Sequence, residues 1–145
     1  MLIALSSVAL LAGCGQSEQE KYTSKMKSIS KQLATEQQQV TGGKSATSLA
    51  EAGAQFKRLQ GVFKRLADRF AGVKPPSKVS DLHQRLTALV RSFADSLGPS
   101  IQAADSRNLK QFKTTASTFK GTLAGFQAQL NNLRNEYKSK GYKLT

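Results

Sequence analysis

Apolar residues recur every three or four positions through most of the chain, which is the spacing of one face of an α-helix. Four such stretches can be distinguished. The first two extend over about 21–40 and 48–71, and the other two over about 77–104 and 106–140. No stretch alternates apolar and polar residues as a half-buried β-strand would. The pattern therefore predicts an all-α protein.

Glycine, proline and capping residues separate these stretches. Gly42-Gly43 follows the first, and the second can begin at Ser48 because Glu51 completes a capping box. Pro75-Pro76 ends the second helix, since proline cannot donate a helical hydrogen bond. Gly98-Pro99 lies inside the third stretch, whose apolar spacing continues beyond it. We therefore expect a kink there rather than an end.

The fourth stretch carries two further local signals. Asp105 and Ser106 are both good N-cap residues, and they stand just before its first apolar position. Gly121 and Gly125 form a Gly-x-x-x-Gly spacing in a helix that also contains Lys120. A membrane dimer face is excluded by such polar neighbours. The spacing instead predicts a close approach of a neighbouring helix.

Phenylalanine recurs every seven residues in the second and the fourth stretch. The two triads are Phe56, Phe63 and Phe70, and Phe112, Phe119 and Phe126. In an up-down-up-down bundle these two helices run parallel on a diagonal, so the triads are predicted to meet across the core axis. The fold prediction is therefore an up-down four-helix bundle over residues 21–145, after an N-terminal signal segment.

The segment from Met1 to Gly13 differs from the rest because it has no charged residue and is mostly apolar. It is too short for a bilayer core that needs about 20 residues, but it matches the apolar region of a secretory signal. It ends in Leu11-Ala12-Gly13-Cys14, which contains the only cysteine. This motif resembles the lipobox of bacterial lipoproteins, and the rest of the chain resembles small uncharacterised helical-bundle lipoproteins.

The resemblance implies that Cys14 is alkylated with diacylglycerol and that the chain is cleaved just before it. Residues 1–13 would be the signal peptide, and residues 14–20 the lipidated cysteine and a tether. Two or more acyl chains, at about 0.8 kcal/mol per buried methylene, form an anchor that hardly dissociates. The implied location is the extracytoplasmic face of the cell membrane or outer membrane. Because the first basic residue is only Lys21, we expect the true translation start to lie upstream.

Composition adds a strong positive charge. The formal net charge is +13 and the sequence pI is about 10.2. We therefore expect an anionic partner: anionic lipid, an acidic wall polymer, an envelope protein or nucleic acid. Two groups of basic residues are candidates for binding an anionic surface: Lys21, Lys25, Lys27 and Lys31 after the tether, and Lys57, Arg58, Lys64, Arg65 and Arg69 in the second helix. Alternatively, these side chains only solvate the polar faces of their helices.

Residue types needed for catalysis or metal binding are sparse. A di-iron site in a helical bundle needs about four glutamates and two Glu-x-x-His pairs, whereas the chain has one histidine, His83, and no such pair. His83 is expected to be a surface or boundary side chain. With no second histidine and scattered carboxylates, a nucleophile-base pair cannot be built. We expect no enzyme activity, no catalytic residue, no metal and no cofactor.

The functional hypothesis is a lipid-anchored, basic helical protein of the bacterial cell envelope with a binding or structural role. One alternative is a cytoplasmic nucleic-acid-binding bundle. Its basic residues would contact phosphates, but they lack interleaved exposed aromatic residues and no known nucleic-acid module is present. Another alternative is a carrier of lipid or another apolar ligand in the phenylalanine-rich core. The alternation of phenylalanine and leucine favours a filled core, because protein interiors are densely packed.

Overall fold

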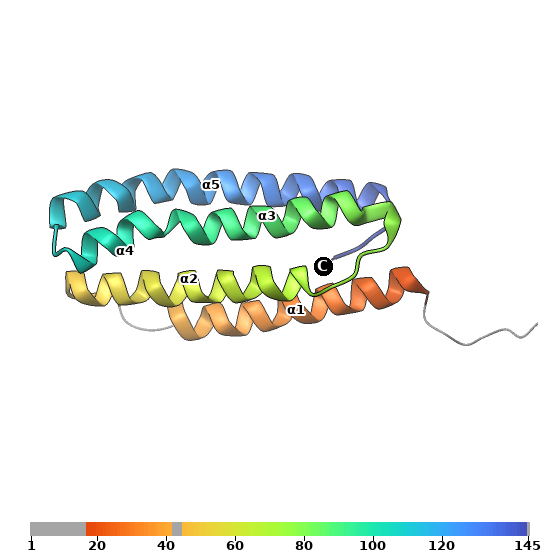
Figure 1. Ribbon diagram of the computed structural model, residues 1–145, viewed down its shortest axis with the longest axis horizontal. Helices are drawn as coiled ribbons and strands as arrows, with labels where there is room; N and C mark the ends of the chain where they lie inside the picture. The colour runs from red at the N-terminus through yellow and green to blue at the C-terminus, as the bar shows by residue number, and fades with distance from the viewer. Residues whose placement is uncertain (1–16, 42–44, 145) are drawn as a thin grey trace, which may run out of the picture.

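The computed structural model describes residues 17–41 and 45–144, and this part of the chain is helical without any strand. The elements are α1 (Glu18–Thr41), α2 (Leu49–Ala71), the short 3-10 helix η1 (Ser77–Val79), α3 (Ser80–Ser96), α4 (Gly98–Asp105) and α5 (Leu109–Ser139). Figure 1 shows that α4 continues in roughly the direction of α3. The two therefore act as one interrupted helix, and the predicted all-α four-helix bundle is confirmed.

The helix α1 begins at Glu18, three residues earlier than predicted, because Ser17 caps it. The backbone N–H of Glu20 donates to the Ser17 hydroxyl over 3.2 Å, and the Ser17 N–H donates to the Glu20 carboxylate over 2.9 Å. This reciprocal capping box satisfies two backbone donors that a helix start leaves free. The end of the predicted tether is thus already helical.

The start of α5 differs from the prediction. Asn108 is its N-cap, and the Asn108 side-chain oxygen accepts a hydrogen bond from the N–H of Gln111 over 3.0 Å. The expectation that Asp105 or Ser106 caps this helix is wrong, because Asp105 is the last residue of α4 and Ser106 follows it as the C-cap. The turn between α4 and α5 is therefore longer than the residue types indicated.

The predicted kink at Gly98-Pro99 is confirmed. The helix α3 ends at Ser96 and α4 begins at Gly98, with proline in its first turn. Proline is tolerated there because the first helical N–H groups have no intrahelical partner to lose. The interruption lets α4 pack against the start of α2 while α3 packs against its remainder.

Two of the three α2 phenylalanines meet the α5 triad across the core as predicted, whereas the ring of Phe70 contacts His83. The Phe56 ring centroid lies 5.6 Å from that of Phe112 and 5.5 Å from that of Phe119. The Phe63 ring centroid lies 5.9 Å from that of Phe126, again edge to face. Such edge-to-face pairs are favourable for aromatic rings. They join α2 and α5 across the diagonal of the bundle.

Close approach of two helices occurs at Gly53 rather than at Gly121 and Gly125. A Cβ atom added to Gly53 would lie 2.6 Å from the Cβ of Ala104 on α4. Gly121 and Gly125 are exposed, and a Cβ atom on either would meet no atom within 4 Å outside its own helical turn. The prediction for this glycine pair is wrong because the pair lies on the solvent side of α5.

Ion pairs join several of the neighbouring helices. They connect α1 with α2, α2 with α3 and α4, and α3 with α5: Glu36–Arg65, Glu36–Arg69, Asp68–Arg91, Lys57–Asp105, Arg85–Glu136 and Asp81–Lys140. Between α1 and α5 the described residues form no ion pair. In Figure 1 these two helices are the outermost ones, with α2 and α3 between them. The bundle is thus least tightly closed between α1 and α5.

Candidate functional site

The four basic residues predicted on the first helix are all exposed on α1. Its core side is formed by Tyr22, Met26 and Ile29, which are buried. The exposed lysines form no ion pair with any described residue, and they are Lys21, Lys25, Lys27 and Lys31. Helical geometry therefore leaves these four ammonium groups available to an external anion.

Two basic residues predicted on the second helix bind α1 instead of solvent. Arg65 and Arg69 of α2 lie 3.1 Å and 2.7 Å from the carboxylate oxygens of Glu36. The hydrogen bond from Arg69 is the main reason that the pKa of Glu36 lies below its ordinary value. These arginines hold α1 against α2, and the single charge of Glu36 compensates one of their two charges.

The remaining basic residues of the second group are divided between a contact and solvent. The Lys57 ammonium lies 2.7 Å from Asp105, which ties α2 to α4. Arg58 and Lys64 are exposed and have no ion pair among the described residues. The structure thus does not bring the five α2 residues together as one binding face.

An apolar groove with a volume of about 340 Å³ lies between α1 and α5. Its floor is formed by α2 and α3, through Phe63, Leu66, Phe70, Leu86 and Val90. Its walls come from the two outermost helices, mainly through Met26, Leu33, Leu123, Phe126, Leu130 and Leu133. This groove lies where α1 and α5 make few direct contacts.

Arg134 of α5 is the only charged side chain among the described residues that line the groove. It is exposed, and it forms no ion pair or hydrogen bond with any described residue. The nearest acidic residue along the helix, Glu136, is bound to Arg85 at the interface with α3. The guanidinium of Arg134 is therefore free for an external anion. The apolar periodicity did not reveal this residue, since it only marks the core face of a helix.

More basic residues flank the groove on both sides. On α1, Lys27 precedes the groove-lining residue Ser30 by three positions, so it lies near the edge of the groove. On α5, two lysines stand within one turn of lining residues: Lys120, three before Leu123, and Lys138, four after Arg134. The rim of the groove is therefore basic on both walls.

One end of the groove is closed by buried polar side chains. The ring Nε2 of His83 lies 2.8 Å from the carbonyl oxygen of Phe70, which can only accept a hydrogen bond, so Nε2 carries the proton. The Nδ1 atom of neutral His83 then accepts a hydrogen bond from the Tyr22 hydroxyl over 3.0 Å. The Tyr137 hydroxyl in turn donates to the Tyr22 oxygen over 2.8 Å. This chain of hydrogen bonds joins α1, α3 and α5.

The expectation that His83 lies at the surface is wrong, because its side chain is only 4% exposed. Burial lowers the pKa of His83, and the hydrogen bond to Phe70 opposes this only in part. Burial also raises the pKa of Tyr22 and of Tyr137. All three side chains are therefore neutral at neutral pH. Both ring nitrogens of His83 are used by protein groups, so neither is directed at a ligand in the groove.

The C-terminal segment covers the same end of the groove. Gly141 has a left-handed backbone with φ of +90°, which turns the chain back after α5. Its carbonyl accepts a hydrogen bond from the Gln19 side chain over 2.7 Å. Tyr142 is buried and Leu144 lines the groove. In Figure 1 this segment runs from the end of α5 back toward the helices α1 and α2.

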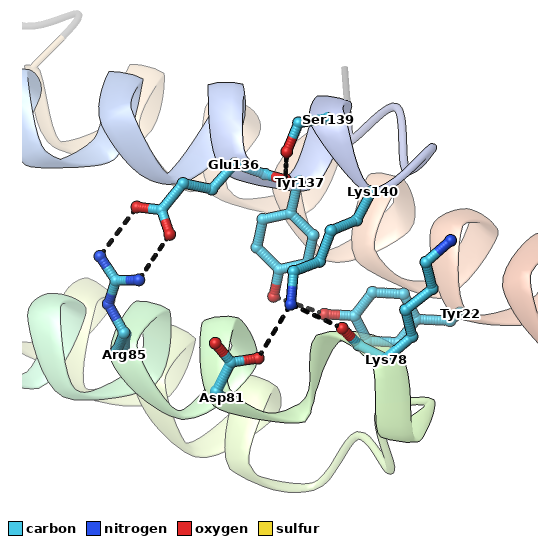
Figure 2. Close-up of polar contacts among 8 residues, drawn as sticks. All are labelled: Tyr22, Lys78, Asp81, Arg85, Glu136, Tyr137, Ser139 and Lys140. Carbon is cyan, nitrogen blue, oxygen red and sulfur yellow. Dashed lines mark hydrogen bonds and ion pairs between the residues drawn. The ribbon is translucent and has the colours of Figure 1, made fainter.

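Polar contacts near this end fix α5 on α3, as Figure 2 shows. Arg85 donates two hydrogen bonds to Glu136, over 2.6 Å and 2.9 Å, and this contact lowers the pKa of Glu136. The Lys140 ammonium lies 3.5 Å from Asp81 and donates to the carbonyl oxygen of Lys78 over 2.9 Å. Exposed ion pairs and hydrogen bonds thus stabilise the closed end of the groove in addition to the buried hydrogen bonds.

No protein-family model, curated protein or solved structure matches this chain. Within residues 17–41 and 45–144, no three acidic, histidine or cysteine side chains are grouped so that they could hold a metal ion. None of the described helices has the length and apolarity needed to cross a bilayer. The predicted lipobox and Cys14 lie outside the described residues. Any functional proposal therefore depends on the residues of the chain itself.

Proposed function

We propose that the protein is a lipid-anchored, basic helical component of a bacterial cell envelope that binds the anionic surface of a membrane. In this proposal Cys14 carries the lipid, and the lysines of α1 contact anionic headgroups. The observation that carries the proposal is the position of these lysines. The helix begins at Glu18, only four residues after Cys14, and its four exposed lysines have no acidic partner among the described residues.

Chain length supports this proposal. A stretch of four residues reaches at most about 14 Å, because an extended residue spans about 3.3–3.6 Å. The first turn of α1 would therefore stay close to the headgroups, although charges are screened over roughly 8 Å at physiological salt. Each lysine near an anionic surface contributes about 1 kcal/mol. A covalent anchor followed by a basic helix thus combines two signals for stable attachment.

The structure narrows the set of residues that we propose for the anionic surface. Lys57, Arg65 and Arg69 already neutralise carboxylates on other helices. Arg58 and Lys64 are exposed without an ion pair among the described residues, so they remain candidates on α2. The α1 lysines are favoured over them because they lie next to the proposed anchor.

The proposed anchor is tested by metabolic labelling. The protein is expressed from its native gene in bacteria supplied with radioactive palmitate, beside the variant Cys14→Ala. We expect label in the wild-type band and none in the variant, and wild-type protein in the membrane fraction. An unlabelled wild-type protein in the soluble cell interior would contradict the anchored function and favour an intracellular role.

A further inference from the structure

We propose that the groove between α1 and α5 binds one acyl chain of an anionic amphiphile, with the anionic headgroup at Arg134. A long-chain fatty acid is the simplest such ligand. This inference goes beyond the proposed anchor and does not depend on it, since it concerns a non-covalent site in the helical body. It commits to a chemical class that combines an apolar chain with one negative charge.

The shape of the groove fits a single chain. Its volume of about 340 Å³ is near the lower end of the range for ligand pockets, about 300–1,000 Å³. Along α5 the lining extends from Leu123 to Tyr137, which is about 21 Å at about 1.5 Å per helical residue. The groove is thus long and narrow, as an extended acyl chain requires.

The two ends of the groove differ. Tyr137 and Leu144 line one end, where the Tyr137 hydroxyl is already hydrogen-bonded to Tyr22. Toward the other end the wall residue Leu123 is 37% exposed, one of the two large hydrophobic side chains that the described part of the chain leaves exposed. A bound acyl chain would therefore lie against the apolar floor of the groove and shield Leu123 from water.

The charge around the groove selects an anion. Arg134 lines the groove and forms no ion pair with any described residue. The residues that flank the groove add further positive charge. A guanidinium can donate two parallel hydrogen bonds to one carboxylate. Such charge-assisted hydrogen bonds are stronger than hydrogen bonds between neutral groups. A neutral amphiphile would leave this charge unused, and a cationic one would be repelled. Charge complementarity thus favours a fatty acid over another apolar occupant.

The test measures binding of radioactive palmitate by equilibrium dialysis. The full chain with Cys14→Ala is used, so that no covalent lipid can compete for the groove. We expect saturable binding of one palmitate per chain. Ala34 is exposed on the α1 wall, so Ala34→Trp fills the groove without removing a core side chain. We expect it to weaken binding at least about tenfold, since the acyl chain loses its contacts.

Matched variants separate the groove from other effects. Ala128→Trp places the same side chain on the exposed side of α5 away from the groove and is expected to bind palmitate as before. Arg134→Gln is expected to weaken palmitate binding about tenfold but to leave the binding of hexadecanol unchanged. Lys110→Gln removes an exposed charge near the start of α5 and is expected to change neither.

Several results would overturn the proposal. The first is a full chain that binds no palmitate saturably, and the second is an Ala34→Trp variant that binds as well as the wild type. Equal affinity of Arg134→Gln for palmitate would reject the headgroup position. A dimer that palmitate does not dissociate would assign the groove to a second copy of the chain. Thermal melting by circular dichroism verifies that each variant is folded, and Ser30→Phe replaces Ala34→Trp if that variant is not.

Discussion

The imidazole of His83 is neutral mainly because it is buried, and each of its ring nitrogens forms one hydrogen bond. Its Nε2–H donates to the carbonyl of Phe70, and its Nδ1 accepts from the hydroxyl of Tyr22. Protonation would convert Nδ1 from an acceptor into a donor. One of the two hydroxyl protons, that of Tyr22 or that of Tyr137, would then have no acceptor within this network. Charging this ring thus costs both desolvation and a buried hydrogen bond.

This arrangement predicts that mild acid destabilises the protein. The pKa of His83 in the folded state lies below the ordinary value of 6.5, mainly because of burial. The unfolded chain therefore binds more protons as the pH falls from about 7.5 to about 5.5, and the free energy of unfolding decreases through this range. Urea denaturation at several pH values measures this slope. We expect a flatter slope for His83→Gln, which does not titrate.

Between about pH 7.5 and about pH 5.5 the ion-paired carboxylates do not change their charge, so they do not contribute to the measured slope. The pKa values of Glu36 and Glu136 are lowered by their arginine partners, Arg69 and Arg85 respectively, so both groups remain charged well below pH 5.5. If the wild type and His83→Gln lose stability equally between the two pH values, another group is responsible and the neutral-histidine network is rejected.

At the scale of elements, α5 is the longest helix and contains two glycines that no neighbour requires. Gly121 and Gly125 are exposed, and there is open space where their side chains would be. A glycine inside a helix is less favourable than alanine because it loses more backbone entropy on folding. Gly53 of α2 is in the opposite situation, since Ala104 of α4 occupies the space next to it.

These positions predict opposite effects of the same substitution. Gly121→Ala and Gly125→Ala should each raise the free energy of unfolding by about 0.5–1 kcal/mol. Gly53→Ala should lower it by about 1–3 kcal/mol, because the new methyl group would clash with Ala104 and force α2 and α4 apart. Urea denaturation of the three variants measures both signs. A stabilising Gly53→Ala would show that the contact between α2 and α4 is looser than described.

At the scale of the whole molecule, the positive charge is only partly compensated inside the bundle. Five of the nine acidic residues are bound to six basic residues, mostly across helix interfaces. Two others, Glu20 and Glu51, accept hydrogen bonds at the starts of α1 and α2. Few carboxylates remain to balance the other lysines and arginines, so most of the net charge of +13 faces outward.

This distribution predicts binding to anionic vesicles that depends on salt and on α1. The full chain with Cys14→Ala should bind phosphatidylglycerol vesicles more tightly than phosphatidylcholine vesicles, and the difference should shrink at high salt. Lys21→Gln with Lys25→Gln should weaken anionic binding by about ten- to thirtyfold, since each lysine contributes about 1 kcal/mol. Cosedimentation with vesicles measures both.

The control for this experiment removes the same charge elsewhere. Lys110→Gln with Lys113→Gln alters two exposed lysines at the start of α5, at the opposite end of the bundle from the start of α1. We expect this pair to weaken binding much less. An equal loss in both double variants would mean that net charge alone is responsible, and equal binding to neutral and anionic vesicles would reject the electrostatic contribution.

Much of the fold could be predicted because it depends on local periodicity. The recurrence of phenylalanine every seven residues predicted that the triads of α2 and α5 meet across the core, and the apolar spacing predicted the kink. His83 was misjudged although it precedes the core residues Leu86 and Val90 by three and seven positions, a helical spacing that marks it as buried.

The groove could not be predicted in the same way. Periodicity identifies which side of a helix faces the core, but not how far apart two helices lie. The separation of α1 and α5 depends on how all the helices pack, through contacts between residues distant in sequence, such as Arg85 and Glu136. The proposed role of Arg134 in binding an anion could not be predicted either. It depends on the structural finding that Arg134 forms no ion pair with any described residue.

The return of the chain after Gly141 has a practical consequence for labelling the protein. Because Tyr142 and Leu144 fold back beside Gln19, the residues after α5 finish at the end of the bundle where α1 starts. An affinity tag appended to the C-terminus would emerge next to the proposed anchor and the closed end of the groove. An epitope inserted in the turn at 106–108 would instead lie at the far end of the bundle and leave both undisturbed.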